Sequence, residues 1–147
     1  MYTSNKTLFV RIVALVMVMV MVAPVNVSAA TVQPRASLYL SNYTAYVYLP
    51  GDGEVRVYFN VEGTGYMDEL GVLYIRLFES TDNSTWTRVT TFTHDRTDGM
   101  LSYNDDYHSG MVSYDGVAGR YYKAYVCVWG GKDGDGDTRF FWTSVKH

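Results

Sequence analysis

An acidic, glycine-rich segment near the C-terminus has residue types that could bind a cation. Its three aspartates, Asp133, Asp135 and Asp137, alternate with glycine, so their carboxylates could turn toward one hard ion such as Ca²⁺. A helical calcium-binding loop also needs glycine at its sixth position and glutamate at its twelfth, where this chain has Thr138 and Ser144. We therefore predict a flexible hairpin tip that needs no metal for folding, and we expect no cofactor.

The residue types that commonly catalyse reactions form no recognisable motif. The histidines His94, His108 and His147 stand far apart, and no serine occupies a nucleophile-elbow sequence. Cys127, the only cysteine, lacks the flanking signature of a thiol nucleophile. The glutamates that could form a glycosidase pair are scattered over predicted strand ends and loops, at Glu54, Glu62, Glu69 and Glu79. We therefore expect a protein without enzymatic activity.

The most abundant side chains that could recognise a ligand are aromatic. The chain has 14 tyrosines and 3 tryptophans. Several of them alternate with apolar residues and are expected to face outward, where a ring can stack on a sugar or dock a protein. The candidate ligand-binding residues are Tyr58, Tyr74, Tyr121, Tyr125 and Trp129. The competing interpretation is that these rings only pair across the strands of an exposed sheet.

Two strongly alternating segments are expected to position these rings. In residues 54–61 the apolar side chains occupy every second position, a pattern typical of a half-buried strand. Residues 73–79 repeat the pattern, with Leu73, Ile75 and Leu77 predicted to point inward. The segment 62–71 between them is too long for a tight hairpin, so we expect it to cross from one sheet to another.

The rest of the chain is predicted to form short strands separated by turns, with no helical periodicity. A turn at 80–84 is expected to join residues 73–79 and 86–92 into a hairpin, and residues 130–137 are expected to form a loop. The other predicted strands cover 38–49, 100–103, 107–114, 121–129 and 138–145.

This pattern predicts an all-β fold, an antiparallel β-sandwich similar to immunoglobulin or fibronectin type III domains, with a jelly roll as the alternative. Tyr122 lies where a tyrosine corner would be, near the start of the penultimate strand. Ala124 stands two residues later, where antibody domains have cysteine, so the disulfide-linked variant is excluded.

The first thirty residues have the layout of a secretory signal peptide, with Lys6 and Arg11 before an apolar run and small residues at 27–30. The alternative is an uncleaved anchor, but the run at 12–23 is shorter than the roughly 20 residues that span a bilayer. We predict cleavage after Ala29 or Ala30, a short linker at 31–37 and one domain at 38–147. We expect no stable membrane insertion after cleavage.

The charge of the predicted mature chain argues against nucleic-acid partners. Without Lys6 and Arg11 it has 10 basic and 15 acidic residues, a net charge of −5, and an acidic domain binds polyanions poorly. The absence of a second cysteine excludes an intramolecular disulfide. It favours a protein exported by a bacterium, because secreted eukaryotic domains commonly have such bridges.

Three sequence strings carry a family resemblance: PRASLYL at 34–40, GTGYMDELG at 63–71 and ESTDNSTW at 79–86. They resemble an uncharacterised family of small secreted proteins of Gram-positive bacteria, catalogued as a domain of unknown function. The resemblance covers nearly the whole predicted mature chain. It implies secretion and a single β-domain, and it transfers no catalytic residue.

These observations lead us to expect a secreted, non-enzymatic binding module, whose ligand is an extracellular glycan or protein held by an aromatic sheet face. Two alternatives remain open: an exported, envelope-associated structural protein, and a small extracellular glycan hydrolase.

Overall fold

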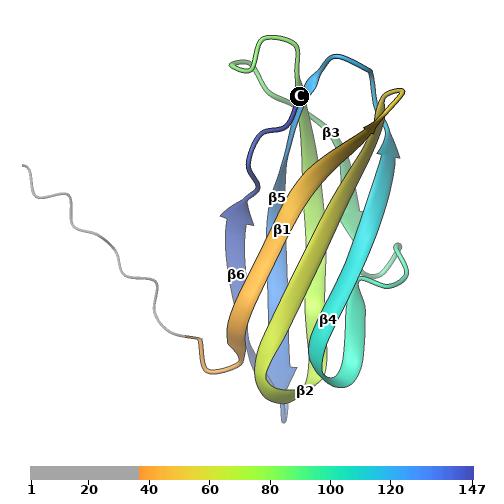
Figure 1. The fold of residues 1–147 in the computed structure, drawn as a ribbon. Helices are drawn as coiled ribbons and strands as arrows, with labels where there is room; N and C mark the ends of the chain where they lie inside the picture. Colours follow the sequence, from red (N-terminus) through yellow and green to blue (C-terminus); the bar gives the residue numbers. More distant parts are fainter. Residues whose placement is uncertain (1–36) are drawn as a thin grey trace, which may run out of the picture. The chain divides into compact units, whose positions relative to one another are not determined.

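The computed structural model describes residues 37–147, which contain six β-strands and no helix. The all-β prediction is confirmed for these residues, and no helix in them is long and apolar enough to cross a membrane. The predicted signal peptide and most of the predicted linker lie outside the described residues. The strands are β1 (Leu40–Gly51), β2 (Glu54–Ser80), β3 (Thr87–Thr93), β4 (Leu101–Asp115), β5 (Tyr121–Lys132) and β6 (Asp135–Trp142) (Figure 1).

Strand β2 is the centre of a single antiparallel sheet. Its first part pairs with β1 on one side and with β4 on the other. Its second part pairs with β5 on one side, and with β3 and the start of β4 on the other. Strand β6 extends the sheet beyond β5. Figure 1 shows that the sheet curls, so that β1 and the first part of β2 lie in front of β5 and the second part of β2.

The bend in β2 coincides with a glycine-rich segment. A Cβ atom on Gly63 would lie 2.6 Å from the carbonyl oxygen of Gly65, so this backbone excludes a side chain at that position. The predicted connection over 62–71 is wrong, because these residues continue the strand: Gly63 still pairs with β1, and Met67 pairs with β4. The expected break at 104–106 likewise lies inside β4.

The interior is filled by the alternating apolar residues of β2 and β5. Leu73, predicted to point inward, is only partly buried, and Val72 is buried instead. The reason is an irregularity between β2 and β5, where the register shifts between Val72 and Tyr74. Each fully buried large apolar side chain contributes roughly 1.5–3 kcal/mol to the stability of the fold. The core residues of these strands include Val55, Val57, Phe59, Val61, Ile75, Leu77, Ala124, Val126 and Val128.

The segment 130–137 is a tight hairpin rather than the flexible loop that we predicted. Gly130 pairs with Asp137 and Lys132 pairs with Asp135, which leaves only Asp133 and Gly134 as the turn. Both turn residues have positive φ angles, 54° and 80°, the geometry of a type I′ turn, which favours Asp-Gly. As a result β6 covers Asp135–Trp142 instead of 138–145.

Tyr122, at the predicted tyrosine-corner position, forms hydrogen bonds through its buried hydroxyl. Its hydroxyl accepts a hydrogen bond from the backbone N–H of Val117 at 2.7 Å and donates one to Glu79 Oε2 at 2.6 Å. Arg120 forms an ion pair with the same carboxylate.

The predicted hairpin between β2 and β3 is confirmed. The strands belong to one continuous curled sheet, so the sandwich type stays a prediction.

Candidate functional site

Aromatic and basic side chains gather on the outer side of β2, β5 and β6. They alternate along each strand with core residues such as Leu77 and Val126, so they must point away from the interior. Cross-strand pairing places Arg76 opposite Tyr125, and Tyr125 opposite Trp142. We name this surface the aromatic–cation face and define it by Tyr74, Arg76, Phe78, Trp86, Lys123, Tyr125, Phe140 and Trp142.

The rings of this face contact one another across three neighbouring strands. The ring centroid of Tyr125 lies 4.9 Å from that of Trp142 and 6.1 Å from that of Phe140, to which it is stacked. The ring centroids of Phe78 and Trp142 lie 5.1 Å apart. The two residues of β6 remain accessible, with Phe140 51% and Trp142 49% exposed. The result is a continuous strip of rings, half-buried on β2 and β5 and open to solvent on β6.

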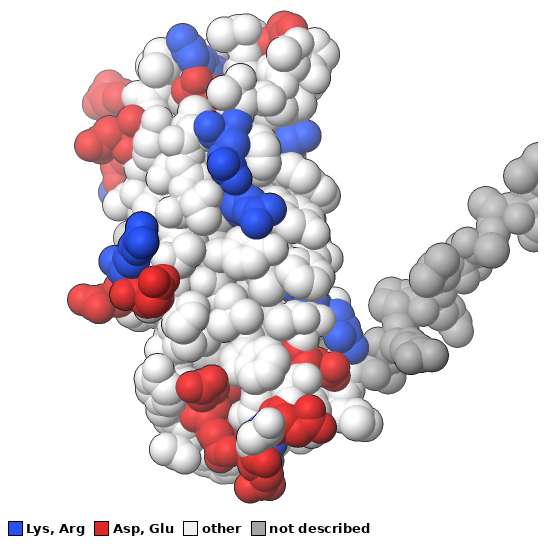
Figure 2. Space-filling model, turned by 180° about the vertical axis from the view of Figure 1, so that it is seen from behind, with Lys and Arg blue, Asp and Glu red and all other residues white. Residues whose placement is uncertain are grey.

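Two cations lie against these rings. Lys123 Nζ lies 4.1 Å from the ring centroid of Trp86 and 4.7 Å from that of Trp142, while Arg76 Cζ lies 4.7 Å from that of Tyr74. Contacts of this kind are worth about 0.5–2 kcal/mol each, depending on desolvation. Figure 2, which views the molecule from behind, shows basic side chains in the middle of this side, and acidic ones along its left edge, at its top and at its lower end.

Cys127 lies within the face but is closed to solvent. It pairs with Tyr74 on β2 and with Phe140 on β6, and its side chain is 1% exposed. Burial raises the pKa of the thiol to about 11, although nearby Arg76 acts in the opposite direction. The protonated thiol is a small apolar residue here, and the low-pKa environment of a reactive cysteine is missing.

Four of the five predicted ligand-binding residues lie on this side of the sheet. Tyr74 and Tyr125 belong to the ring strip, and Tyr121 lies at one end of β5, 4.3 Å between centroids from the His147 ring. Trp129 lies toward the other end of β5, where its indole N–H donates to Glu69 Oε2 at 3.2 Å.

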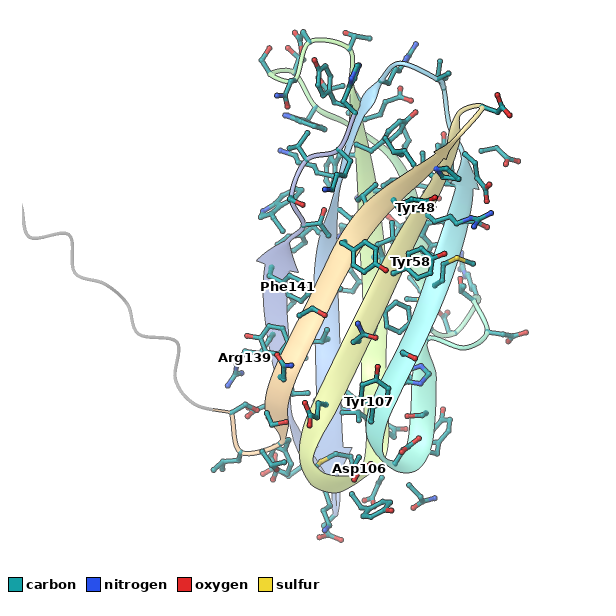
Figure 3. The ribbon with its side chains drawn as sticks, in the orientation of Figure 1. Tyr48, Tyr58, Asp106, Tyr107, Arg139 and Phe141 are labelled. Carbon is teal, nitrogen blue, oxygen red and sulfur yellow. The ribbon has the colours of Figure 1, made fainter. Side chains whose placement is uncertain are left out.

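Tyr58 instead lies on the outer side of β1 and β4, at the front of Figure 3. Its ring stacks on Tyr46, with centroids 5.3 Å apart, and meets the edge of Tyr48 at 6.3 Å. A shallow groove beside these rings is lined by Asn60, Ser109 and Met111 among others. We name this surface the tyrosine face and define it by Tyr46, Tyr48, Tyr58, Asn60, Tyr107, Ser109 and Met111.

Several members of the aromatic–cation face were not among the predicted binding residues. Phe140 and Trp142 occupy alternate positions of β6, a pattern that would have marked them as sharing one side. Their importance comes from the pairing of β6 with β5, which places them beside Tyr125. Trp86 was assigned to a strand, but it lies just before β3, where its ring meets Lys123.

The aspartates of the acidic hairpin hold the beginning of the domain. Asp137 Oδ2 accepts hydrogen bonds from Ser37 Oγ at 2.7 Å and from the backbone N–H of Leu38 at 3.1 Å. The hydrogen bond from Ser37 has the largest effect on the pKa of Asp137, and together these bonds hold that pKa below its ordinary value. Asp135 accepts from the hydroxyl of Tyr39 at 3.0 Å. Within residues 37–147, no group of three or more His, Cys, Asp or Glu side chains is arranged to hold a metal ion.

No protein-family model matches this chain, and a comparison with curated proteins found no match either.

Proposed function

We propose that this chain is a secreted, non-enzymatic binding module that holds an extracellular glycan on its aromatic–cation face. The observation that carries the proposal is the contact of the half-buried Tyr125 ring with the exposed rings of Phe140 and Trp142 on the adjacent strand. The C–H faces of sugar rings are flat and apolar while their edges carry hydroxyls. Half-exposed aromatic rings on a sheet match both features.

The sheet keeps this face ready for binding. Strands β2 and β5 are hydrogen bonded on both sides over this region, and the ring contacts restrict the side chains further. Little conformational freedom is therefore left to lose when a ligand binds, which favours affinity. A flat, pre-organised surface suits an extended polymer better than a small molecule, which needs a concave pocket.

The same proposal covers fold type and location. We propose that the curled sheet is a sandwich of the immunoglobulin-like kind, supported by the bond between Tyr122 and Val117. The resemblance to secreted proteins of Gram-positive bacteria and the predicted signal peptide support a role outside the cell.

The test compares matched variants on the two outer faces. The full-length chain is expressed in a secreting host and run in affinity electrophoresis against a panel of neutral and anionic polysaccharides. The double change Tyr125→Ala and Trp142→Ala should weaken binding at least tenfold, about 1.4 kcal/mol. The control change, Tyr46→Ala and Tyr58→Ala, removes two rings of the tyrosine face and should leave binding intact.

Two results would overturn the proposal. One is that no polysaccharide in the panel retards the wild-type protein. The other is that the control variant loses binding while the aromatic–cation variant keeps it. Circular dichroism and melting curves of both variants show whether either change unfolds the domain.

A further inference from the structure

We infer that the ligand of the aromatic–cation face is an acidic polysaccharide whose sugar rings carry carboxylates, that is, one built from uronic acids. This inference rests on the proposed function and adds the chemical class of the glycan. It comes from the cations of the face rather than from its rings.

The cations of this face have no acidic partner. In the described part of the chain, the ion pairs involve Arg56, Arg96, Arg120 and Arg139. Arg76 and Lys123 take part in none of them, and the groups that they contact are aromatic rings. A domain with an acidic surplus thus leaves positive charge uncompensated on this surface.

The strands themselves exclude acids from the face. Strands β3 and β5 contain no aspartate or glutamate, and Glu79 is the only acid of β2 after Glu69. Glu79 is mostly buried, and its carboxylate is occupied by Arg120 and Tyr122. The acidic residues of β6, Asp135 and Asp137, lie at its beginning, away from Trp142. The turn before Trp86 contributes one acid, Asp82, whose carboxylate accepts hydrogen bonds from the backbone N–H groups of Ser84 and Thr85. The strand residues of the face therefore contribute positive charge, although the whole domain is acidic.

The geometry of Arg76 suits a carboxylate. The guanidinium Cζ lies 4.7 Å from the centroid of the Tyr74 ring, and a contact with one ring leaves N–H groups of the guanidinium able to donate to a ligand. Those N–H groups form the planar fork that binds a carboxylate with two parallel hydrogen bonds. The ammonium of Lys123 offers three more donors beside Trp86 and Trp142.

The spacing of rings and cations indicates where the ligand carries its charge. Arg76 pairs directly with Tyr125, and Lys123 is the diagonal neighbour of Arg76 across β2 and β5, about 7–8 Å away between Cα positions. Stacking rings and cations therefore alternate within the size of one or two sugar units. A carboxylate attached directly to the sugar ring meets both at once, whereas a charge on a linker between sugars does not.

The experiment compares acidic polysaccharides with their own neutral esters. Polygalacturonate, alginate and hyaluronan are each paired with the corresponding ester, which has the same backbone without the charge, and binding to the full-length protein is measured by calorimetry. We expect at least tenfold tighter binding to the acid of at least one pair. We also expect this preference to shrink when NaCl rises from 50 to 200 mM.

The variants separate charge from stacking. Arg76→Gln and Lys123→Gln should each lower the affinity for the acid severalfold and leave that for the ester unchanged. Arg56→Gln, which removes a cation already paired with Glu54 on the other outer side, should change neither. Melting curves check that all three variants are folded.

Each remaining outcome has a defined meaning. Equal affinity for acid and ester overturns the inference and leaves the proposed function standing. Equal binding of dextran sulfate and the uronate polymers also overturns it, because the face would then respond to charge alone. Failure to bind any polymer, neutral or acidic, contradicts the proposed function itself.

Discussion

Tyr58 and Tyr74 project outward from the same strand, β2, yet they lie on opposite sides of the molecule. Tyr58 pairs with Tyr46 of β1 and Met111 of β4, whereas Tyr74 pairs with Thr93 of β3 and Cys127 of β5. The cause is the bend at Gly63–Gly65, which folds the second part of β2 behind the first (Figure 1). The domain therefore has two aromatic outer faces, and only one of them carries unpaired cations.

The hydroxyl of Tyr122 should be essential for stability. Tyr122→Phe leaves the N–H of Val117 without its acceptor and the mostly buried carboxylate of Glu79 without one of its donors. We expect a loss of about 1–3 kcal/mol, the usual cost of an unsatisfied buried group. Urea denaturation should show a lower midpoint with an unchanged slope. Tyr121→Phe, at the neighbouring and more exposed position, should cost little. Equal stability of Tyr122→Phe and wild type would contradict this account.

Stability should also fall in alkaline solution. Burial, and then the hydrogen bond to Glu79, raise the pKa of Tyr122 to about 12 from 10.0. The unfolded chain therefore releases this proton first as the pH rises, so the contribution of Tyr122 to the free energy of unfolding is fully retained below about pH 10 and is lost toward pH 12. Cys127, with its pKa raised to about 11 from 9.0, acts in the same direction from about pH 9. Urea titrations at several pH values should show the decrease, and the double variant Tyr122→Phe, Cys127→Ala should show less of it. An unfolding free energy that does not change between pH 9 and pH 12 in the wild type would contradict the raised pKa values of Tyr122 and Cys127.

Gly136 should not tolerate a side chain. A Cβ atom there would lie 2.4 Å from the Trp129 ring, and one on Gly131 would lie 2.6 Å from it. Gly136→Ala must therefore push the indole away from Glu69, at the usual overpacking cost of about 1–3 kcal/mol. Gly65→Ala is the matched control, because no atom lies within 4 Å of its Cβ position. Thermal melts of both variants test this, and an unshifted melt for Gly136→Ala would show that the ring moves freely.

Calcium should have little effect on the domain. Asp135 and Asp137 already accept hydrogen bonds from the start of the chain, so a cation would have to displace Ser37 and Tyr39. We expect the melting temperature to change by less than about 2 °C between calcium and chelator. A shift of about 5 °C or more that Asp135→Asn abolishes would instead establish a metal site.

The sequence was sufficient for the alternating segments of the strands, but not for where the strands end or how they pair. Alternation in residues 54–61 identified the buried side chains correctly, because period two is a property of any strand with one covered face. The glycines at 63–65 and 130–136 were interpreted as breaks, yet neighbouring strands supply hydrogen-bonding partners through the first region, and an Asp-Gly turn closes the second. The partners of the first region are distant in sequence, so local composition carries no sign of them. The Asp133–Gly134 turn of the second region is a local hairpin signal that the sequence does contain.

The same limit applies to the candidate site. Periodicity shows that Tyr58 and Tyr74 point outward, but not that a bend separates them onto two surfaces. Nor does it show that Trp142 meets Lys123 and Tyr125, since that contact depends on how β6 pairs with β5. The individual aromatic residues could be found from the sequence, and the face that they form required the structure.

The most direct test of the proposed binding face is a nitrogen–proton NMR titration of the labelled protein with a soluble oligosaccharide of the glycan that binds. The indole N–H signals of Trp86 and Trp142 report on the aromatic–cation face, and the backbone amide signals of Tyr46 and Tyr58 report on the tyrosine face. We predict saturable shifts of the two indole signals, while the two amide signals stay in place. Shifts confined to Tyr46 and Tyr58, with Trp86 and Trp142 unchanged, would contradict the proposed location of binding.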